Sequence, residues 1–180
     1  MLLVSQNLLN YDMNFPKDTV LRVNLAWVDS IEKLEETLSR SKSDFFIDLP
    51  SGRIKPPNNK YEIEDLLPVF RRYNNVKFLA ISNVETASVV NDYRQLVNDQ
   101  LIIVPKIETI KGIKNIEVIG RSLSEKKYIM LDHDDLFTNV VKNGEGPNYF
   151  IELVDDLVDF CKKSDICLLR ARGIIFSNEI

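Results

Sequence analysis

Charged side chains follow several of the apolar segments in this sequence. In the stretch Leu101–Ile113, an apolar run leads directly into Lys106 and Glu108. Side chains on a β-strand alternate between its two faces, so these two side chains point the same way. Glu108, with an aspartate at the end of the next apolar run, would provide carboxylate ligands for a hard divalent cation such as Mg²⁺. A nearby lysine and arginine would bind phosphate or carboxylate groups of a substrate.

Polar residues recur at the ends of other apolar runs. Arg22 and Asn24 alternate along one run, and Asp48 and Ser82 stand near the ends of the next two. Local alternatives stay open: Lys106 and Glu108 could form an ion pair at a rim, and the "DHDD" stretch from 132 to 135 could be a solvated acidic loop. The sequence also leaves open the roles of three further polar residues, His133, Arg170 and Arg172.

The elements that must position these residues alternate along the chain. Apolar, β-branched runs are followed by stretches with the periodicity of amphipathic helices. The predicted strands are Met1–Ser5, Val20–Ala26, Phe45–Leu49, Val76–Ile81, Leu101–Lys106, Tyr128–Leu131 and Ile166–Leu169. The predicted helices are Ser30–Ser39, Ile63–Tyr73, Thr86–Val97, Ile110–Ser122 and Tyr149–Lys163.

Short local signals refine the ends of these helices. Asp29 with Glu32 three residues later resembles a capping box for the first helix. Pro68 is expected to kink or shorten the second helix, and Pro147 lies just before the last one, where a missing N–H costs little.

This alternation predicts an α/β fold with a parallel sheet whose faces are covered. We expect a (β/α) TIM-type barrel, incomplete at about seven strands, formed by a single domain over residues 1–180. In such folds ligands bind beyond the carboxyl ends of the strands, where the polar residues named above lie. The first run is not followed by a glycine-rich phosphate loop, so a P-loop or dinucleotide site is not indicated.

The composition excludes several classes of partner. The net charge of -4 offers no general attraction to nucleic acid or anionic membranes. No apolar run reaches the ~20 residues needed to span a bilayer, and the N-terminal stretch lacks the basic start of a signal peptide. We therefore expect a cytoplasmic protein in which Cys161 and Cys167 are reduced.

Five short motifs, in order, resemble those of pyruvate kinases. "VLRVNLAW" resembles V-A-R-L-N-F-S-H, "FIDLPSGRIK" resembles L-D-T-K-G-P-E-I-R, and "ISNVETASVV" resembles A-S-F-I-R-K-A-S-D-V. "PKIETIKGIKNIEVI" is similar to S-K-I-E-N-x-E-G-V, and "YIMLDHDDL" is similar to I-M-V-A-R-G-D-L-G. The matches run from about Val20 to Leu136. Counterparts of the lid and C-terminal domains of these enzymes are missing, so full ADP-phosphorylating activity is not expected.

The resemblance implies roles for individual residues. Lys106 would face the transferred phosphoryl group and the enolate oxygen, and Arg22 would grip the substrate phosphate. Glu108 and Asp135 would hold Mg²⁺ or Mn²⁺, and Asp48 aligns with a potassium-ligating aspartate as a weaker metal ligand. Asn24 and Ser82 align with residues at the substrate site.

The function implied is Mg²⁺-dependent binding of, or action on, phosphoenolpyruvate or pyruvate-type keto acids through an enolate. Citrate-lyase-like aldolases, which use a similar Glu and Asp-Leu at successive strand ends, imply lyase chemistry from the same residues. The alternative is a non-catalytic barrel that serves as a binding, regulatory or assembly module. Because an open sheet edge invites pairing, we expect a homo-oligomer, a partner chain or the tail "GIIFSNEI" to cover it.

Overall fold

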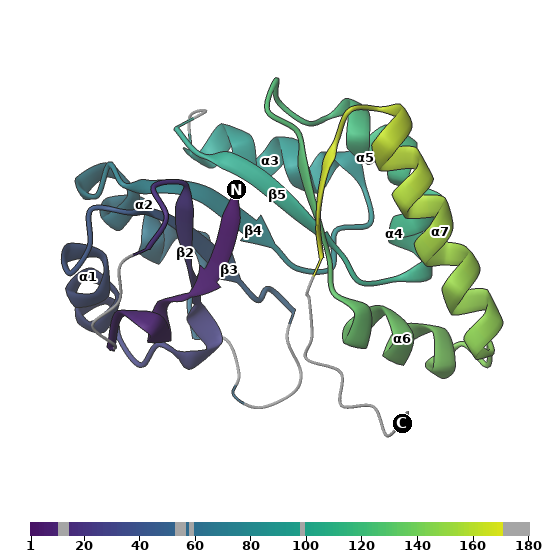
Figure 1. Ribbon diagram of the computed structural model, residues 1–180, viewed down its shortest axis with the longest axis horizontal. Helices are drawn as coiled ribbons and strands as arrows, with labels where there is room; N and C mark the ends of the chain where they lie inside the picture. The colour runs from purple at the N-terminus through teal and green to yellow at the C-terminus, as the bar shows by residue number, and fades with distance from the viewer. Residues whose placement is uncertain (11–14, 53–56, 58–59, 98–99, 171–180) are drawn as a thin grey trace.

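The protein is built on one curled sheet of seven parallel strands, shown in the computed structural model of Figure 1. The structure describes residues 1–10, 15–52, 57, 60–97 and 100–170. Each strand pairs with its neighbours in the sequence, so the order across the sheet is the sequence order from β1 to β7. The strands are β1 (Leu2–Ser5), β2 (Thr19–Asn24), β3 (Asp44–Leu49), β4 (Val76–Ile81), β5 (Ile102–Ile107), β6 (Tyr128–Leu131) and β7 (Cys167–Arg170).

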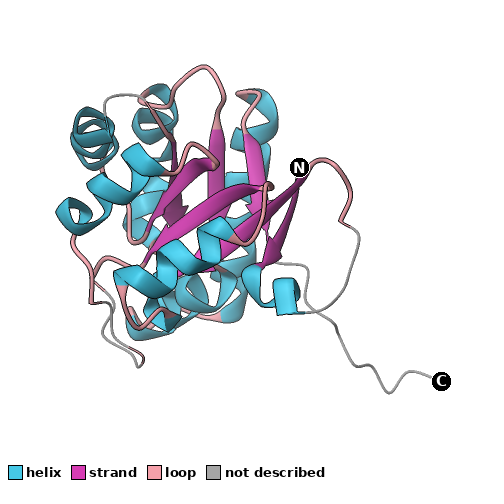
Figure 2. Cartoon of the chain, turned by 90° about the vertical axis from the view of Figure 1, so that its left-hand side faces the viewer, coloured by secondary structure: helices cyan, strands magenta, loops and turns pink. Residues whose placement is uncertain are grey.

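Helices connect successive strands and pack around the sheet (Figure 2). Short 3₁₀ turns, η1 (Gln6–Asn10) and η2 (Leu25–Trp27), follow the first two strands. The α-helices are α1 (Ile31–Ser39), α2 (Ile63–Arg72), α3 (Ala87–Val97), α4 (Ile110–Lys114), α5 (Ile116–Arg121), α6 (His133–Lys142) and α7 (Pro147–Lys163).

The two faces of the sheet are buried in different ways. On the outer face, strand residues such as Leu21, Ile47 and Leu79 pack with the apolar stripes of the helices in one large core. On the inner face, a smaller cluster contains strand residues alone. Its buried members are Val20, Phe46, Phe78, Ala80, Val104 and Met130. The helices therefore cover the outer face, and the inner face forms the concave side of a half-barrel.

The predicted α/β class and the parallel sheet of about seven strands are confirmed. The sheet is an open half-barrel, because in the described sheet β1 pairs only with β2 and β7 only with β6. The expectation that the tail from 171 to 180 covers an edge falls outside the described residues.

Some helix boundaries differ from those predicted. Ser30, rather than Asp29, caps α1, because its hydroxyl accepts a hydrogen bond from the N–H of Lys33 at 3.3 Å. The predicted helix from Ile110 to Ser122 is two helices that meet at Asn115. The Asn115 side-chain amide donates to the carbonyl of Glu85 at 2.9 Å, a tertiary contact that the local sequence does not reveal.

Helix α6 is an element that the sequence interpretation missed. We expected the stretch from Asp132 to Asp135 to be the polar end of a strand or an acidic loop. Instead, Asp132 is the N-cap of α6, and its side chain accepts a hydrogen bond from the N–H of Asp135 at 3.3 Å. Leu136 and Val140, four residues apart, bury the inner side of this helix.

Proline had less effect on the helices than expected. Pro68 lies inside α2, which continues to Arg72, so the predicted shortening is small. Pro147 is in the first turn of α7, where its fixed φ suits the helix start.

Among the described residues, no helix is both long and apolar enough to cross a membrane. Cys161 and Cys167 are both free thiols, the first buried and the second exposed.

Candidate functional site

The polar side chains predicted to carry the chemistry gather at the carboxyl edge of the sheet. Lys106 is in β5 and Glu108 follows it, while Asp48 is near the end of β3. Ser82 follows β4, and Asp132 follows β6. Among the buried polar or charged residues of the described chain, four lie at this edge: Asp48, Ser82, Lys106 and Glu108. Burying polar groups lowers the free energy of unfolding unless the groups are paired. The ion pairs and hydrogen bonds among these side chains therefore explain why the fold tolerates their burial.

Lys106 is the centre of this group. Its residue is only 4% exposed, and its Nζ lies 2.8 Å from Oε1 of Glu108 and 3.5 Å from Oδ1 of Asp48. The same Nζ donates a hydrogen bond to the hydroxyl of Ser82 at 3.1 Å. The lysine therefore links polar residues of three neighbouring strand ends.

The charges in this group change the proton affinities of its members. Burial alone would lower the pKa of Lys106, but the negative charges of Asp48 and Glu108 outweigh that effect and hold its pKa above the ordinary value. Burial raises the pKa of Glu108, and the opposing effects of Lys106 and the Asn83 N–H offset this only in part. Lys106 is thus held as a cation, and further positive charge beside Glu108 would favour its ionised form.

A three-carboxylate cluster, formed by Glu108, Asp132 and Asp135, lies beside the lysine. Each contributes one oxygen, and these oxygens lie within 4.8 Å of one another. Opposite oxygen ligands of Mg²⁺ are about 4.2 Å apart, twice the usual bond length, so a small side-chain shift would complete such a set. The cluster includes both residues predicted to hold the metal. The sequence interpretation did not assign Asp132 as a ligand, although an aspartate three residues before Asp135 is typical of an N-cap.

Glu108 supplies a second sign that this cluster suits a cation. Its residue is 3% exposed, and its Oε2 accepts a hydrogen bond from the N–H of Asn83 at 2.7 Å. Its Oε1 lies 2.8 Å from Nζ of Lys106, so one cation already compensates this oxygen. An ionised carboxylate has about four lone-pair sites, so Glu108 has the capacity to contact Lys106 and a metal ion together.

Asn83 holds Glu108 in place through an unusual backbone conformation. Its φ of 55° is in the left-handed region, which Asn tolerates better than most residues. This conformation accompanies the N–H contact with Glu108, while the Asn83 side-chain amide donates to the carbonyl of Ser51 at 3.2 Å. The sequence shows Asn83 as a polar residue at a strand end but gives it no role, because its contact with Glu108 joins residues 25 positions apart.

Arg22 and Asn24 lie on the same face of β2 as this group. Nε of Arg22 donates to Oδ2 of Asp48 at 3.1 Å, and a second guanidinium nitrogen contacts the same oxygen. Asp48, predicted as a weaker metal ligand, is therefore an ion-pair partner of Arg22 and Lys106 and is outside the three-carboxylate cluster. The side-chain oxygen of Asn24 accepts from the N–H of Ala26 at 3.0 Å and caps η2.

His133 and Arg170 form a separate contact at the rim. Nε2 of His133 lies 3.4 Å from a guanidinium nitrogen of Arg170. Burial and then the charge of Arg170 lower the pKa of His133, so the imidazole is neutral over more of the pH range than a free histidine. The described three-carboxylate cluster does not include this histidine, and Arg172 lies outside the described residues.

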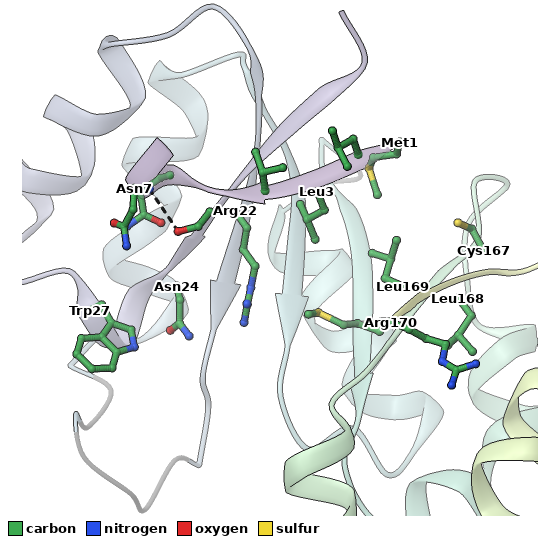
Figure 3. Close-up of a pocket in the computed structure, with 15 residues that line it drawn as sticks. Met1, Leu3, Asn7, Arg22, Asn24, Trp27, Cys167, Leu168, Leu169 and Arg170 are labelled. Atoms are coloured by element: carbon green, nitrogen blue, oxygen red, sulfur yellow. Dashed lines mark hydrogen bonds between the residues drawn. The ribbon is translucent and has the colours of Figure 1, made fainter. Parts of the chain in front are cut away.

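A cavity of about 1110 Å³ opens between the two free sheet edges (Figure 3). Residues of β1 and of β7 line its opposite sides. Arg22, Asn24 and Trp27 also line it, so the cavity extends to the polar edge of the sheet. The open side of the half-barrel is therefore a groove, which we call the β1–β7 groove.

Comparison with known proteins supports the fold and corrects the family. No family model matches the chain, and no curated protein matches it. A solved structure, RipC from Yersinia pestis, is similar with a TM-score of 0.62 and 15% sequence identity, over 88% of this chain and 72% of that one. At such low identity the likeness concerns the fold alone.

The predicted membership of the pyruvate kinase family is wrong. The structural likeness is to RipC and to a parallel half-barrel, and nothing in the comparisons points to pyruvate kinases. The five motifs were short, so their order alone did not establish a family. The roles that the resemblance gave to individual residues must therefore be argued from the geometry.

Proposed function

We propose that the protein binds a divalent cation, Mg²⁺ or Mn²⁺, at Glu108, Asp132 and Asp135, and holds a pyruvate-type keto acid or its enolate beside it. The observation that carries this proposal is the three-carboxylate cluster: Glu108, Asp132 and Asp135 each bring one oxygen within 4.8 Å of the others. Glu108, the buried member of the cluster, is only 3% exposed. We also propose that the half-barrel is a shortened TIM-type barrel, since its parallel strands follow the sequence order.

The balance of charge supports a divalent ligand. Four carboxylates, those of the three-carboxylate cluster and Asp48, face two cations, Arg22 and Lys106. A divalent cation would bring these six side chains close to neutrality, and neutrality lowers the cost of keeping charges out of water. Carboxylate oxygens are also the ligands that Mg²⁺ prefers.

The residues around the cluster have distinct roles in this proposal. The bound cation would supply Lewis-acid stabilisation of negative oxygen. Lys106, held as an ammonium between two carboxylates, would donate to an enolate oxygen, and its fixed position means that little reorganisation is needed. Arg22, whose side chain is 32% exposed, retains access to solvent and would contact the ligand carboxylate. Asn24 and Ser82 would lie at the margin of this ligand.

A thermal-shift titration tests this function. Wild-type protein would be heated with Mn²⁺, with oxalate as an enolate mimic, and with both together. We expect the largest rise in Tm with both, since a ligand at one hundred times its Kd adds about 2.7 kcal/mol to stability. Glu108→Gln should abolish the Mn²⁺-dependent rise, whereas Glu117→Gln, on the exposed side of α5, should retain it. Absence of any Mn²⁺ effect on the wild type at millimolar concentration would refute the proposal.

Replacement of Asn83 is expected to lower the affinity for Mn²⁺, although Asn83 is not one of the proposed metal ligands. In Asn83→Val, a β-branched side chain disfavours the left-handed backbone, so the N–H that holds Glu108 should move. We expect Mn²⁺ affinity to fall by about tenfold or more, as is typical when a group that orients a ligand is lost. Asn83→Gly keeps both the conformation and the N–H and serves as the control. Equal Mn²⁺ affinity in the Val and Gly variants, measured by calorimetry, would show that Asn83 does not position Glu108.

A non-catalytic role is the second candidate, and the two free sheet edges favour it. In the described sheet, β1 and β7 each have one neighbour, so each presents unpaired backbone groups along one side. A second copy or a partner chain that pairs with these edges would make the half-barrel an assembly module. Sedimentation would show a concentration-dependent oligomer in this case.

A cytoplasmic location remains part of the proposal and is supported by the two free cysteines.

A further inference from the structure

The β1–β7 groove is larger than a bare keto acid requires. Its volume of about 1110 Å³ is just above the usual range for small-molecule pockets, which typically measure about 300–1,000 Å³ and hold drug-sized ligands. A three-carbon acid at the metal and Lys106 would leave most of the groove empty.

Apolar side chains form much of the lining of the groove. Leu3 of β1 and Leu169 of β7 pack against the inner cluster, to which Met130 of β6 belongs. In Figure 3, Leu3 and Leu169 come from opposite sides of the opening. These side chains would stabilise the apolar part of a ligand by removing it from water.

Exposed hydrophobic residues also gather along this groove. Met1 and Leu2, at the start of the chain, and Trp27, which is 69% exposed, all line it. Large apolar side chains exposed together along one cavity are typical of a binding surface. Trp27 lies near Asn24 at one side of the opening (Figure 3).

Arg22 of β2 belongs both to the groove lining and to the polar group at the sheet edge. Arg22 lines the groove and contacts Asp48, which in turn lies 3.5 Å from Nζ of Lys106. Leu3 and Leu169 line the same cavity as Arg22. A ligand whose acid group contacts Arg22 would therefore have apolar walls beside its chain.

We infer that the ligand is an amphipathic keto acid, with its 2-oxo acid head at the metal site and an apolar chain of several carbons in the β1–β7 groove. This inference rests on the proposed function and names its substrate class. It differs from a bare pyruvate-type ligand, because the chain would contribute a large share of the binding free energy.

A chain-length series tests the inference. Mn²⁺-loaded protein would be titrated by calorimetry with pyruvate, 2-oxobutanoate, 2-oxohexanoate and 2-oxooctanoate. We expect the Kd to fall by about fourfold for each methylene group buried. Trp27 is the single tryptophan of the chain, so its fluorescence should change with the longer acids and report on the groove itself.

Two variants locate the chain within the groove. Leu169→Gln places a polar amide on the apolar wall, and Trp27→Ala removes an exposed ring without disturbing the core. Both should flatten the dependence of Kd on chain length. Val118→Gln, at an exposed apolar position on α5 away from the groove lining, is the matched control and should keep the wild-type dependence. Thermal melts would confirm that each variant is folded.

The outcomes separate this inference from the proposed function. If Mn²⁺ binds but all four acids bind equally well, the inference is wrong and the metal site stands. If Mn²⁺ does not bind, both fail. If 1-octanol binds as tightly as 2-oxooctanoate, the groove is independent of the acid head and the inference is overturned. A dimer that Trp27→Ala dissociates would show that a second copy occupies the groove, which also overturns it.

Discussion

Lys106→Met is expected to destabilise the fold by about 3–5 kcal/mol, the usual cost of removing one partner from a buried ion pair. Methionine has a similar shape but no charge. The carboxylates of Asp48 and Glu108, both almost fully buried, would lose the cation that lies between them. Arg22 would still contact Asp48, but Glu108 would have no ion-pair partner among the described residues. Urea denaturation measures this loss of unfolding free energy.

The cost should also depend on pH. The pKa of Glu108 is already raised by burial, and loss of Lys106 would raise it further. When the pKa of a carboxyl is higher in the folded than in the unfolded protein, its contribution to folding stability is fully present below the unfolded pKa. That contribution is lost as the pH rises through the folded pKa. The destabilisation in Lys106→Met should therefore be larger at about pH 8 than at about pH 5.

Lys111→Met is the matched control for this variant. Nζ of Lys111 lies 2.9 Å from a carboxylate oxygen of Glu85, but the lysine side chain is 63% exposed. Exposed ion pairs contribute about 0–1 kcal/mol, so this variant should remain close to the wild type. A pH-independent cost below about 1 kcal/mol in Lys106→Met would show that water reaches the buried carboxylates.

Phe46→Ala is expected to cost about 3–5 kcal/mol, because a buried aromatic ring would leave a cavity that the sheet cannot close. Phe46 is fully buried on the inner face, where its ring stacks on Phe78 with centroids 5.9 Å apart. Phe78 in turn meets the edge of Tyr128 at 5.5 Å. These three rings therefore form part of the apolar packing on the inner face of the half-barrel.

Phe137→Ala is the control for this variant, because it also removes a ring that contacts another ring but is not buried. Phe137 also meets another ring, Phe150 at 5.3 Å, but it is 40% exposed. Its replacement should cost clearly less in urea denaturation, since it removes less apolar surface from the interior. If Phe46→Ala cost no more than Phe137→Ala, the inner face would have to be hydrated.

The local sequence determined the elements and their order. Continuous apolar runs separated by amphipathic stretches predicted a parallel sheet, because a strand covered on both faces has no need of polar alternation. The two-residue spacing of Lys106 and Glu108 placed both side chains on one face, and the structure has them in contact. The same two-residue alternation placed Arg22 and Asn24 on one face of β2, which is the inner face of the sheet.

Tertiary structure decided which of these residues meet. Asp48 is far from Lys106 in the sequence, and only the curl of the sheet brings their charges within 3.5 Å. The ligand role of Asp132 depends on α6, whose start in "DHDDL" resembles an acidic loop when its surroundings are unknown. The β1–β7 groove likewise depends on how far the sheet curls, since strand order alone is compatible with a closed or an open barrel. Local periodicity fixes the face on which a side chain lies, but the curvature of the whole sheet fixes the distances between strands that are not neighbours.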